Sequence, residues 1–227
     1  MARLLDPAVH AVRRDTFIEI AQRLIQAKGY EQMSIQDVLD DVQASRGAFY
    51  HYFDSKAALL EAVVDRMVEA AISTVTPLTA DPGMPALQKL QGVFTGIARW
   101  KGERTELMLA LLQVWLSDEN AIVREKFRHG LVARLAPLLA AIVRQGAHEG
   151  VFTSDCPDDL ARVLISLLQG ANEAAVELYV ARRAGKVSFE AVERLLATYV
   201  EAFERLLGLS RGSLTLIDQA VLREWYG

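Results

Sequence analysis

The 227-residue sequence has a single cysteine, Cys156, so an internal disulfide is excluded and a reducing compartment such as the cytoplasm is expected. Its 6 prolines and 14 glycines are too few for a collagen-like or low-complexity chain. It also lacks an uninterrupted apolar run near the roughly 20 residues of a membrane span, and its first seven residues hold no run of signal-peptide length. We therefore expect a cytoplasmic protein without a membrane partner.

An excess of positive charge is absent as well. The 25 Lys and Arg residues are outnumbered by 29 Asp and Glu residues, which gives a formal net charge of -4. Taken alone, this balance argues against a nucleic-acid partner. The apolar share of 52% excludes a disordered chain and suffices for a sizeable core, in one large domain or two small ones.

Apolar residues recur at helical spacing along nearly the whole chain, which predicts an all-α fold. Gly29 ends the first helix, and the three prolines and one glycine of residues 76–85 predict a loop. Residues 105–116 are apolar on nearly all faces, which predicts a helix buried all round. The predicted helices span residues 17–28, 34–42, 45–53, 55–75, 87–100, 105–116, 118–146, 158–184 and 188–207, with a last amphipathic piece over 214–225.

Two short helices joined by a tight turn, residues 34–53, form the most informative segment. Ser34 and Ser45 are good N-cap residues, and Asp37 completes a sequence that imitates a capping box. Gly47 inside the second helix costs about 1 kcal/mol relative to Ala, which close approach of another backbone would justify. Because residues 42–53 also lack carboxylates, we interpret the pair as a helix-turn-helix unit whose second helix enters the DNA major groove.

Lys56 lies in the first turn of the next helix, where a cation opposes the helix dipole unless an anion is bound there. Helix starts attract phosphate through their free N–H groups, and Ser34 marks a second such start. With Arg46, Tyr50 and His51, these positions predict a set of phosphate contacts around a recognition helix. Tyr50 and Phe49 also suit core aromatics, and His51, Arg46 and Lys56 also suit solvated surface positions, so both interpretations stay open.

Residues 17–60 resemble the DNA-binding domain of the TetR (tetracycline repressor) family. The shared pattern is Gly29-Tyr30 after the first helix, then Ser45-Arg46-Gly47-Ala48-Phe49-Tyr50, then Phe53-Asp54-Ser55-Lys56-Ala57-Ala58-Leu59. The resemblance implies that Ser34, Tyr50, His51 and Lys56 contact phosphates and that Arg46, Gly47, Ala48 and Tyr50 approach base edges, with Ser45 as the cap of the recognition helix. A charge argument adds Arg3, Arg13 and Arg14, before or at the start of the first helix.

The sequence departs from the family pattern at Gln43, where a glycine usually lies in the turn between the two helices. If Gln43 takes a positive φ, the strain is about 1 kcal/mol. The departure concerns the geometry of the turn and leaves the motif intact.

The resemblance implies a three-helix DNA-binding domain over residues 1–56 and a larger helical domain over 57–227 that binds a small, mostly apolar effector and forms the homodimer. The helices near 158–184 and 188–207 are the predicted dimer elements, because both carry apolar residues on more than one face. Asn172 lies in a run of small and apolar residues, and Met and large aromatic residues suit an adaptable cavity. Helical spacing explains the latter as core equally well, so the ligand contacts remain one of two interpretations: Met67, Phe94, Trp100, Met108, Trp115, Phe127 and Asn172.

The expected function is a ligand-responsive transcriptional regulator, most simply a repressor of a pseudo-palindromic operator. The alternatives are an all-α enzyme and a helical protein-interaction module. An enzyme is disfavoured because no catalytic or cofactor motif is present, and Glu125 with His129 fits a surface ion pair better than a metal site. Residues 1–60 contain seven Lys and Arg against eight Asp and Glu, so the monomer is expected to bind DNA weakly.

Overall fold

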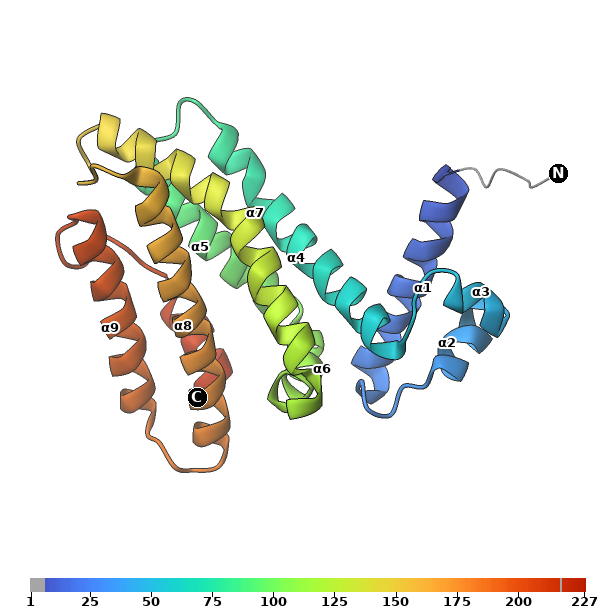
Figure 1. The fold of residues 1–227 in the computed structure, drawn as a ribbon. Coiled ribbons are helices and arrows are strands. Elements are labelled where there is room, and N and C mark those ends of the chain that lie inside the picture. The colour runs from blue at the N-terminus through green and yellow to red at the C-terminus, as the bar shows by residue number, and fades with distance from the viewer. Residues whose placement is uncertain (1–6, 217) are drawn as a thin grey trace. The chain divides into compact units, whose positions relative to one another are not determined.

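The computed structural model describes residues 7–216 and 218–227, apart from the side chains of Pro7 and Gln113. Over these ranges the chain is helical and has no strand, as expected for an all-α protein (Figure 1). The elements are α1 (Pro7–Lys28), α2 (Ile35–Val42), α3 (Arg46–Tyr50), α4 (Lys56–Ala80), α5 (Ala86–Gly102), α6 (Thr105–Leu116), η1 (Asp118–Asn120), α7 (Ala121–His148), α8 (Pro157–Arg183), α9 (Phe189–Leu207) and α10 (Gln219–Tyr226).

Packing divides the chain into two compact units that do not follow chain order. One unit comprises Met1–Glu69 and Arg104–His129, and the other comprises Ala70–Glu103 and Gly130–Gly227. Helices α4 and α7 therefore each contribute residues to both units. The domain boundary predicted after residue 56 follows the end of the sequence motif and stays a prediction.

An aromatic core holds the first three helices together. Phe17 of α1 and Phe49 of α3 are fully buried, and Phe53 is 3% exposed. The ring centroid of Phe49 lies 5.8 Å from that of Phe17 and 5.7 Å from that of Phe53. Phe49 therefore anchors α3 to α1, which assigns it to the core of this unit.

The first helix is longer than its apolar spacing predicts. It starts at Pro7, well before Phe17, and ends where Gly29 takes a φ of 80°. The prediction that Arg13 and Arg14 precede or begin this helix is wrong, because good helix-forming residues follow Pro7 and proline is favoured in a first helical turn. Arg3 lies outside the described residues.

Helix α4 continues through Pro77 to Ala80, so the loop predicted over residues 76–85 is shorter than expected. Proline removes one backbone hydrogen bond, but here the loss falls near the end of a 25-residue helix. Hydroxyl groups supply further bonds to helix carbonyls, from Thr76 to Ile72 O at 3.0 Å and from Thr79 to Thr76 O at 2.8 Å. A single missing bond therefore does not end the helix.

Helix α6 is not buried all round, contrary to the prediction. Among its described side chains only Leu107 and Val114 are buried, and Leu116 is 47% exposed. These two buried residues are seven positions apart and lie on one face of the helix. The apolar composition of α6 therefore exceeds what its own unit covers.

The C-terminal helices α8, α9 and α10 pack on one another. Val192 and Leu196 of α9 form a buried cluster with Leu222 and Tyr226 of α10. The Tyr226 hydroxyl donates to Ala175 O at 2.9 Å, and burial, with a smaller effect from nearby Tyr179, raises the pKa of Tyr226 to about 12. The predicted last amphipathic piece is thus a docked helix, although Ile217 lies outside the described residues.

One stretch, Asp118–His148, is long and apolar enough to cross a membrane by length and composition. The apolar window in this stretch is 33% buried within the described structure. A core helix of a soluble protein meets the same two criteria, so the stretch is weak support for a membrane span.

Candidate DNA-binding site

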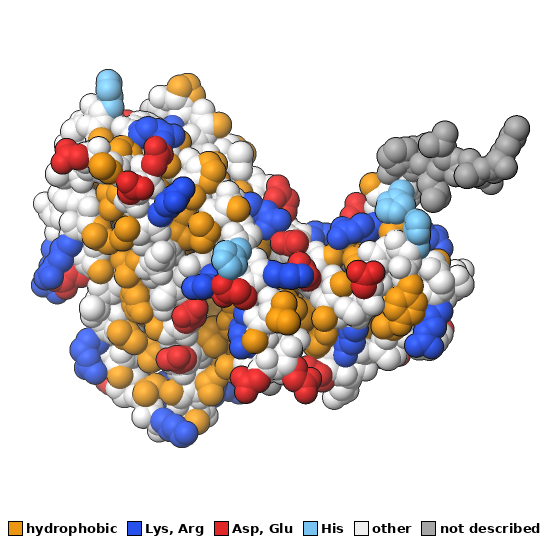
Figure 2. Space-filling view, in the orientation of Figure 1, with side chains coloured by type: hydrophobic (Ala, Val, Ile, Leu, Met, Phe, Trp, Pro, Cys, Tyr) orange, Lys and Arg blue, Asp and Glu red, His pale blue; other side chains and the backbone are white. Residues whose placement is uncertain are grey.

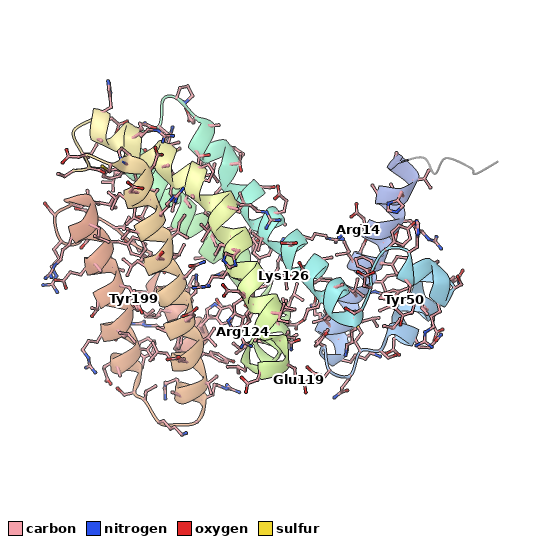
Figure 3. All side chains as sticks on the ribbon, viewed as in Figure 1. Arg14, Tyr50, Glu119, Arg124, Lys126 and Tyr199 are labelled. Carbon is pink, nitrogen blue, oxygen red and sulfur yellow. The ribbon has the colours of Figure 1, made fainter. Side chains whose placement is uncertain are left out.

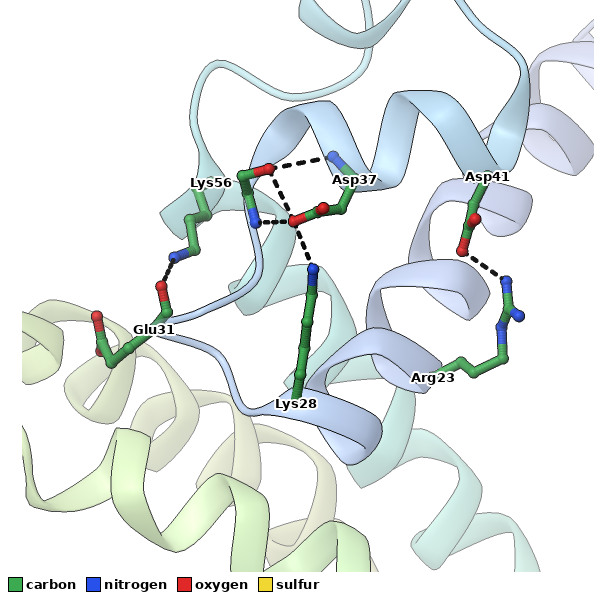
Figure 4. A network of polar contacts seen from close by, with 7 residues as sticks. Arg23, Lys28, Glu31, Asp37, Asp41 and Lys56 are labelled. Carbon is green, nitrogen blue, oxygen red and sulfur yellow. Dashed lines mark hydrogen bonds and ion pairs between the residues drawn. The ribbon is translucent and has the colours of Figure 1, made fainter.

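The start of α2 is fixed by a reciprocal cap. The Asp37 N–H donates to the Ser34 hydroxyl at 3.1 Å, and the Ser34 N–H donates to the Asp37 carboxylate at 2.6 Å. Lys28, at the end of α1, pairs with the same carboxylate at 2.7 Å (Figure 4). The bond from Lys28, followed by those from Ser34, holds the pKa of Asp37 well below its ordinary range. The predicted capping box is therefore present, and an ion pair ties it to α1.

The turn after α2 contains the strained residue that the sequence indicated. Gln43 has φ 53° and ψ 50°, and it is the one non-glycine residue of positive φ in the described part of the chain. The turn closes through Gln43 N–H to Asp40 O at 3.3 Å and Ala44 N–H to Leu39 O at 3.0 Å. A glycine would adopt this conformation without the cost that a Cβ adds.

The recognition helix α3 is short and mostly exposed. The Ser45 hydroxyl accepts from the Ala48 N–H at 3.2 Å, as an N-cap does. The helix ends at Tyr50 instead of Phe53, because the following amides turn back to Phe49 O at 2.9 and 3.0 Å. Arg46 and Gly47 are exposed, Tyr50 is 46% exposed (Figure 3), and Ala48 is half-buried.

Gly47 leaves open space on this surface. A Cβ built there meets no atom closer than the Ser45 hydroxyl, at 4.0 Å. Packing within the described chain therefore does not require a glycine, and its helix-weakening effect remains unexplained by the fold. Close approach of an external partner accounts for both observations.

The acidic residues that flank α3 in sequence are partly neutralised by α1. Arg23 pairs with Asp41 at 2.8 Å, as Lys28 pairs with Asp37 (Figure 4). Across the ranges the structure describes, no carboxylate forms an ion pair with Arg46. The exposed surface of α3 therefore presents a positive charge that no acidic partner cancels.

Lys56 has two local contacts that the sequence did not predict. Its ammonium lies 4.2 Å from the centroid of the Tyr30 ring and donates to Glu31 O at 3.3 Å (Figure 4). Burial, followed by the nearby charges of Glu31 and Glu119, raises the pKa of Tyr30. These contacts direct the charge away from the start of α4 and explain its tolerance there without a bound anion.

His51 lies beside a second histidine that sequence analysis missed. The His10 ring of α1 is 5.3 Å from the His51 ring and 4.6 Å from the Tyr52 ring, centroid to centroid. His10 is distant in sequence and belongs to no motif, so only the packing of α1 against the segment after α3 reveals the pair. Arg14 of α1 approaches the same segment, with its guanidinium carbon 5.2 Å from the Phe53 ring centroid.

The predicted ligand-contact residues fall in both compact units. In the first, Trp115 and Phe127 pack edge to face at 4.8 Å, and Met67 is buried. Met108, in the same unit, is half-buried. In the second unit Trp100 is buried, the Phe94 ring lies 5.4 Å from that of Phe203, and Asn172 Oδ1 accepts from Lys101, which the sequence analysis had not singled out. Their assignment to a ligand stays a prediction.

Glu125 forms ion pairs with neighbours on α7. Its carboxylate lies 2.9 Å from Arg128 and 3.3 Å from His129. The interpretation of Glu125 and His129 as a surface pair agrees with these contacts. In the described part of the chain, no three His, Cys, Asp or Glu side chains form a group suited to a metal ion.

Comparison with known proteins agrees with this geometry. Residues 17–63 match the family described as bacterial regulatory proteins, tetR family. The HTH-type transcriptional repressor DhaR of Mycobacterium sp. (strain GP1) is 25% identical over 70% of this chain and 79% of its own length. The HTH-type transcriptional repressor KstR2 of Rhodococcus jostii (strain RHA1) is 22% identical over 80% of this chain and 86% of its own length.

The fold also matches solved structures. A TetR transcription regulator from Haloarcula marismortui ATCC 43049 superposes with a TM-score of 0.60 over 85% of this chain and 98% of that chain, at 22% identity. At this level of identity the match shows a common fold. With the matched domain and the named relatives, it shows that this chain is not an enzyme but a transcription regulator of the tetR family.

Proposed function

We propose that this protein is a homodimeric repressor that binds a pseudo-palindromic operator and releases it when a small, mostly apolar effector binds. The observation that carries the proposal is the exposed, acid-free surface of α3, with Arg46 unpaired among the described residues and Gly47 open. A helix presented in this way is suited to the DNA major groove.

Different residues around α3 serve different tasks in the proposed complex. Arg46, Gly47, Ala48 and Tyr50 face the base edges, and Ser45 caps their helix. Ser34, Tyr50, His51 and Lys56 contact phosphates, which set the register but carry no sequence information. The contact from Lys56 to Tyr30 supports a fixed position for that ammonium beside the site.

The proposed dimer forms through α8 and α9, the helices predicted near 158–184 and 188–207. At 100° per residue, Leu195, Tyr199, Ala202 and Leu206 share one face of α9. Leu195 is 38% exposed and Leu206 is 39% exposed, whereas Val192 and Leu196 face the core. Hydrophobic side chains gather over α8 and α9 in Figure 2, and Tyr199 is labelled there on α9 in Figure 3. An apolar face of this kind supports a two-fold interface.

The effector acts by population shift in this proposal. A ligand that binds better to a dimer with a different spacing of its two α3 helices lowers operator affinity by its differential affinity for the two states. Helix α4 begins beside the DNA-binding segment and contributes residues to both compact units, so it is the proposed lever.

A duplex from the protein's own promoter, titrated by fluorescence anisotropy across a salt series, tests the proposal. We expect a steep decrease of affinity with salt, because phosphate contacts release counterions. Arg46→Ala and Tyr50→Ala should each weaken binding at least about tenfold, as expected for lost base contacts. The exposed Arg211, far from α3 in sequence, provides the control Arg211→Ala.

Two results contradict the proposal. A flat salt dependence favours a protein-interaction module over a DNA-binding protein. Unchanged affinity of Arg46→Ala and Tyr50→Ala shows that α3 does not recognise the operator.

A further inference from the structure

A half-buried lysine in the second compact unit has an amide as its polar partner. Lys101, in the last turn of α5, donates from Nζ to Asn172 Oδ1 of α8 at 3.2 Å. An ammonium group offers three donors, and this bond uses one of them. The pair joins two helices 71 residues apart in sequence.

The charge of Lys101 lacks an acidic counterpart within the described ranges of the chain, where no carboxylate forms an ion pair with it. A charge removed from water without a partner is costly, and burial lowers the pKa of Lys101 accordingly. Arg99 provides the contrast, because it lies in the same last turn but stays exposed. The helix dipole favours a cation at either position, so it does not explain why Lys101 points inward.

The surroundings of the pair have room and apolar surface. A Cβ added at Gly102, next to Lys101, meets no atom within 4 Å. On α8, residues 167–172 are all half-buried, so no side of this stretch is fully packed by the described chain. Trp100, which precedes Lys101, is 8% exposed.

We infer that Lys101 and Asn172 bind the carboxylate of an effector whose remaining part is apolar. The inference deepens the proposed function, because it names the chemical class of the effector. The ammonium pairs with the carboxylate, while the Asn172 amide N–H donates a second bond. A single ammonium matches the single charge of a carboxylate better than the two charges of a phosphate, which proteins usually bind with arginine or several backbone amides.

Straight-chain carboxylates of 6 to 12 carbons, hexanoate to dodecanoate, are suitable probes, each compared with the alcohol of equal length. Binding is measured by calorimetry and by the shift of the melting temperature, since a ligand of the native state stabilises it. We expect the best carboxylate to bind at least about tenfold more tightly than its alcohol, as charge-assisted hydrogen bonds allow. Lys101→Met should bind acid and alcohol equally, and Arg99→Met should keep the preference.

A second variant guards against a failure of Lys101→Met to fold. Asn172→Asp keeps the shape of the side chain and supplies an internal carboxylate to Lys101. We expect it to raise the melting temperature of the free protein and to abolish the preference for the acid. Equal binding of acid and alcohol by the unchanged protein, no binding of any acid, or a retained preference in Lys101→Met overturns the inference.

Operator binding of the free protein is recorded in parallel. If the operator binds but the carboxylate preference is absent, the effector class is wrong and the proposed regulator stands. If the carboxylate binds through Lys101 but the operator does not bind, the site stands and the proposed regulator fails.

Discussion

The Lys28 ammonium lies 2.7 Å from the Asp37 carboxylate, which also completes the cap at the start of α2. One carboxylate thus joins the end of α1 to the helix that precedes the recognition helix. Since both contacts require the ionised form, they hold the pKa of Asp37 below its ordinary range.

Acid should therefore destabilise the protein in part through Asp37. Its folded pKa is lower than that of an unfolded carboxyl group, about 4. Its contribution to stability is complete well above pH 4 and is lost as the pH falls from about 4 through the lower folded pKa. Urea unfolding at pH 6 and pH 3 should show a smaller loss for Asp37→Asn than for the unchanged protein. Asp54→Asn, at an exposed position, is the control, and an equal loss in all three proteins contradicts the assignment.

Gln43→Gly should stabilise the protein by about 0.5–1 kcal/mol, because glycine adopts the left-handed conformation without strain. Urea unfolding measures the change. Gln36→Gly is the matched control, since Gln36 lies within α2 and glycine there should cost about 1 kcal/mol. Destabilisation by both substitutions would show that the turn gains nothing from glycine.

Gly47→Ala should separate folding from DNA binding. The added methyl meets open space in the free protein and improves helix propensity by up to about 1 kcal/mol, so the melting temperature should stay or rise. Operator affinity should fall at least about tenfold if the DNA approaches this backbone closely. Unchanged affinity in the anisotropy titration would place the DNA elsewhere.

Leu206→Glu should dissociate the proposed dimer, because a charge buried in an apolar interface lacks a partner. Sedimentation velocity should show a monomer, and operator affinity should fall since both half-sites are no longer bound together. Ile122→Glu is the control, because Ile122 is 72% exposed and lies outside α8 and α9. A Leu206→Glu protein that remains dimeric rules out this face of α9.

Much of the DNA-binding segment was predictable because its structure depends on hydrogen bonds within four residues. The Ser34 and Ser45 caps, the end of α1 at Gly29 and the strained turn at Gln43 are of this kind. Where a local signal misled, at Pro77, the prediction ended α4 too early, because one proline weighs less in a long packed helix than in a short segment.

The sequence alone determined the all-α class, the helix-turn-helix segment and its exposed α3. Tertiary packing alone decided the partners of the charged side chains: Asp37 for Lys28, Tyr30 for Lys56 and Asn172 for Lys101. It also decided that α6 keeps apolar side chains partly exposed. Helical periodicity indicates which residues share a face, but which neighbour covers that face depends on how the helices pack, and no spacing along the chain encodes that.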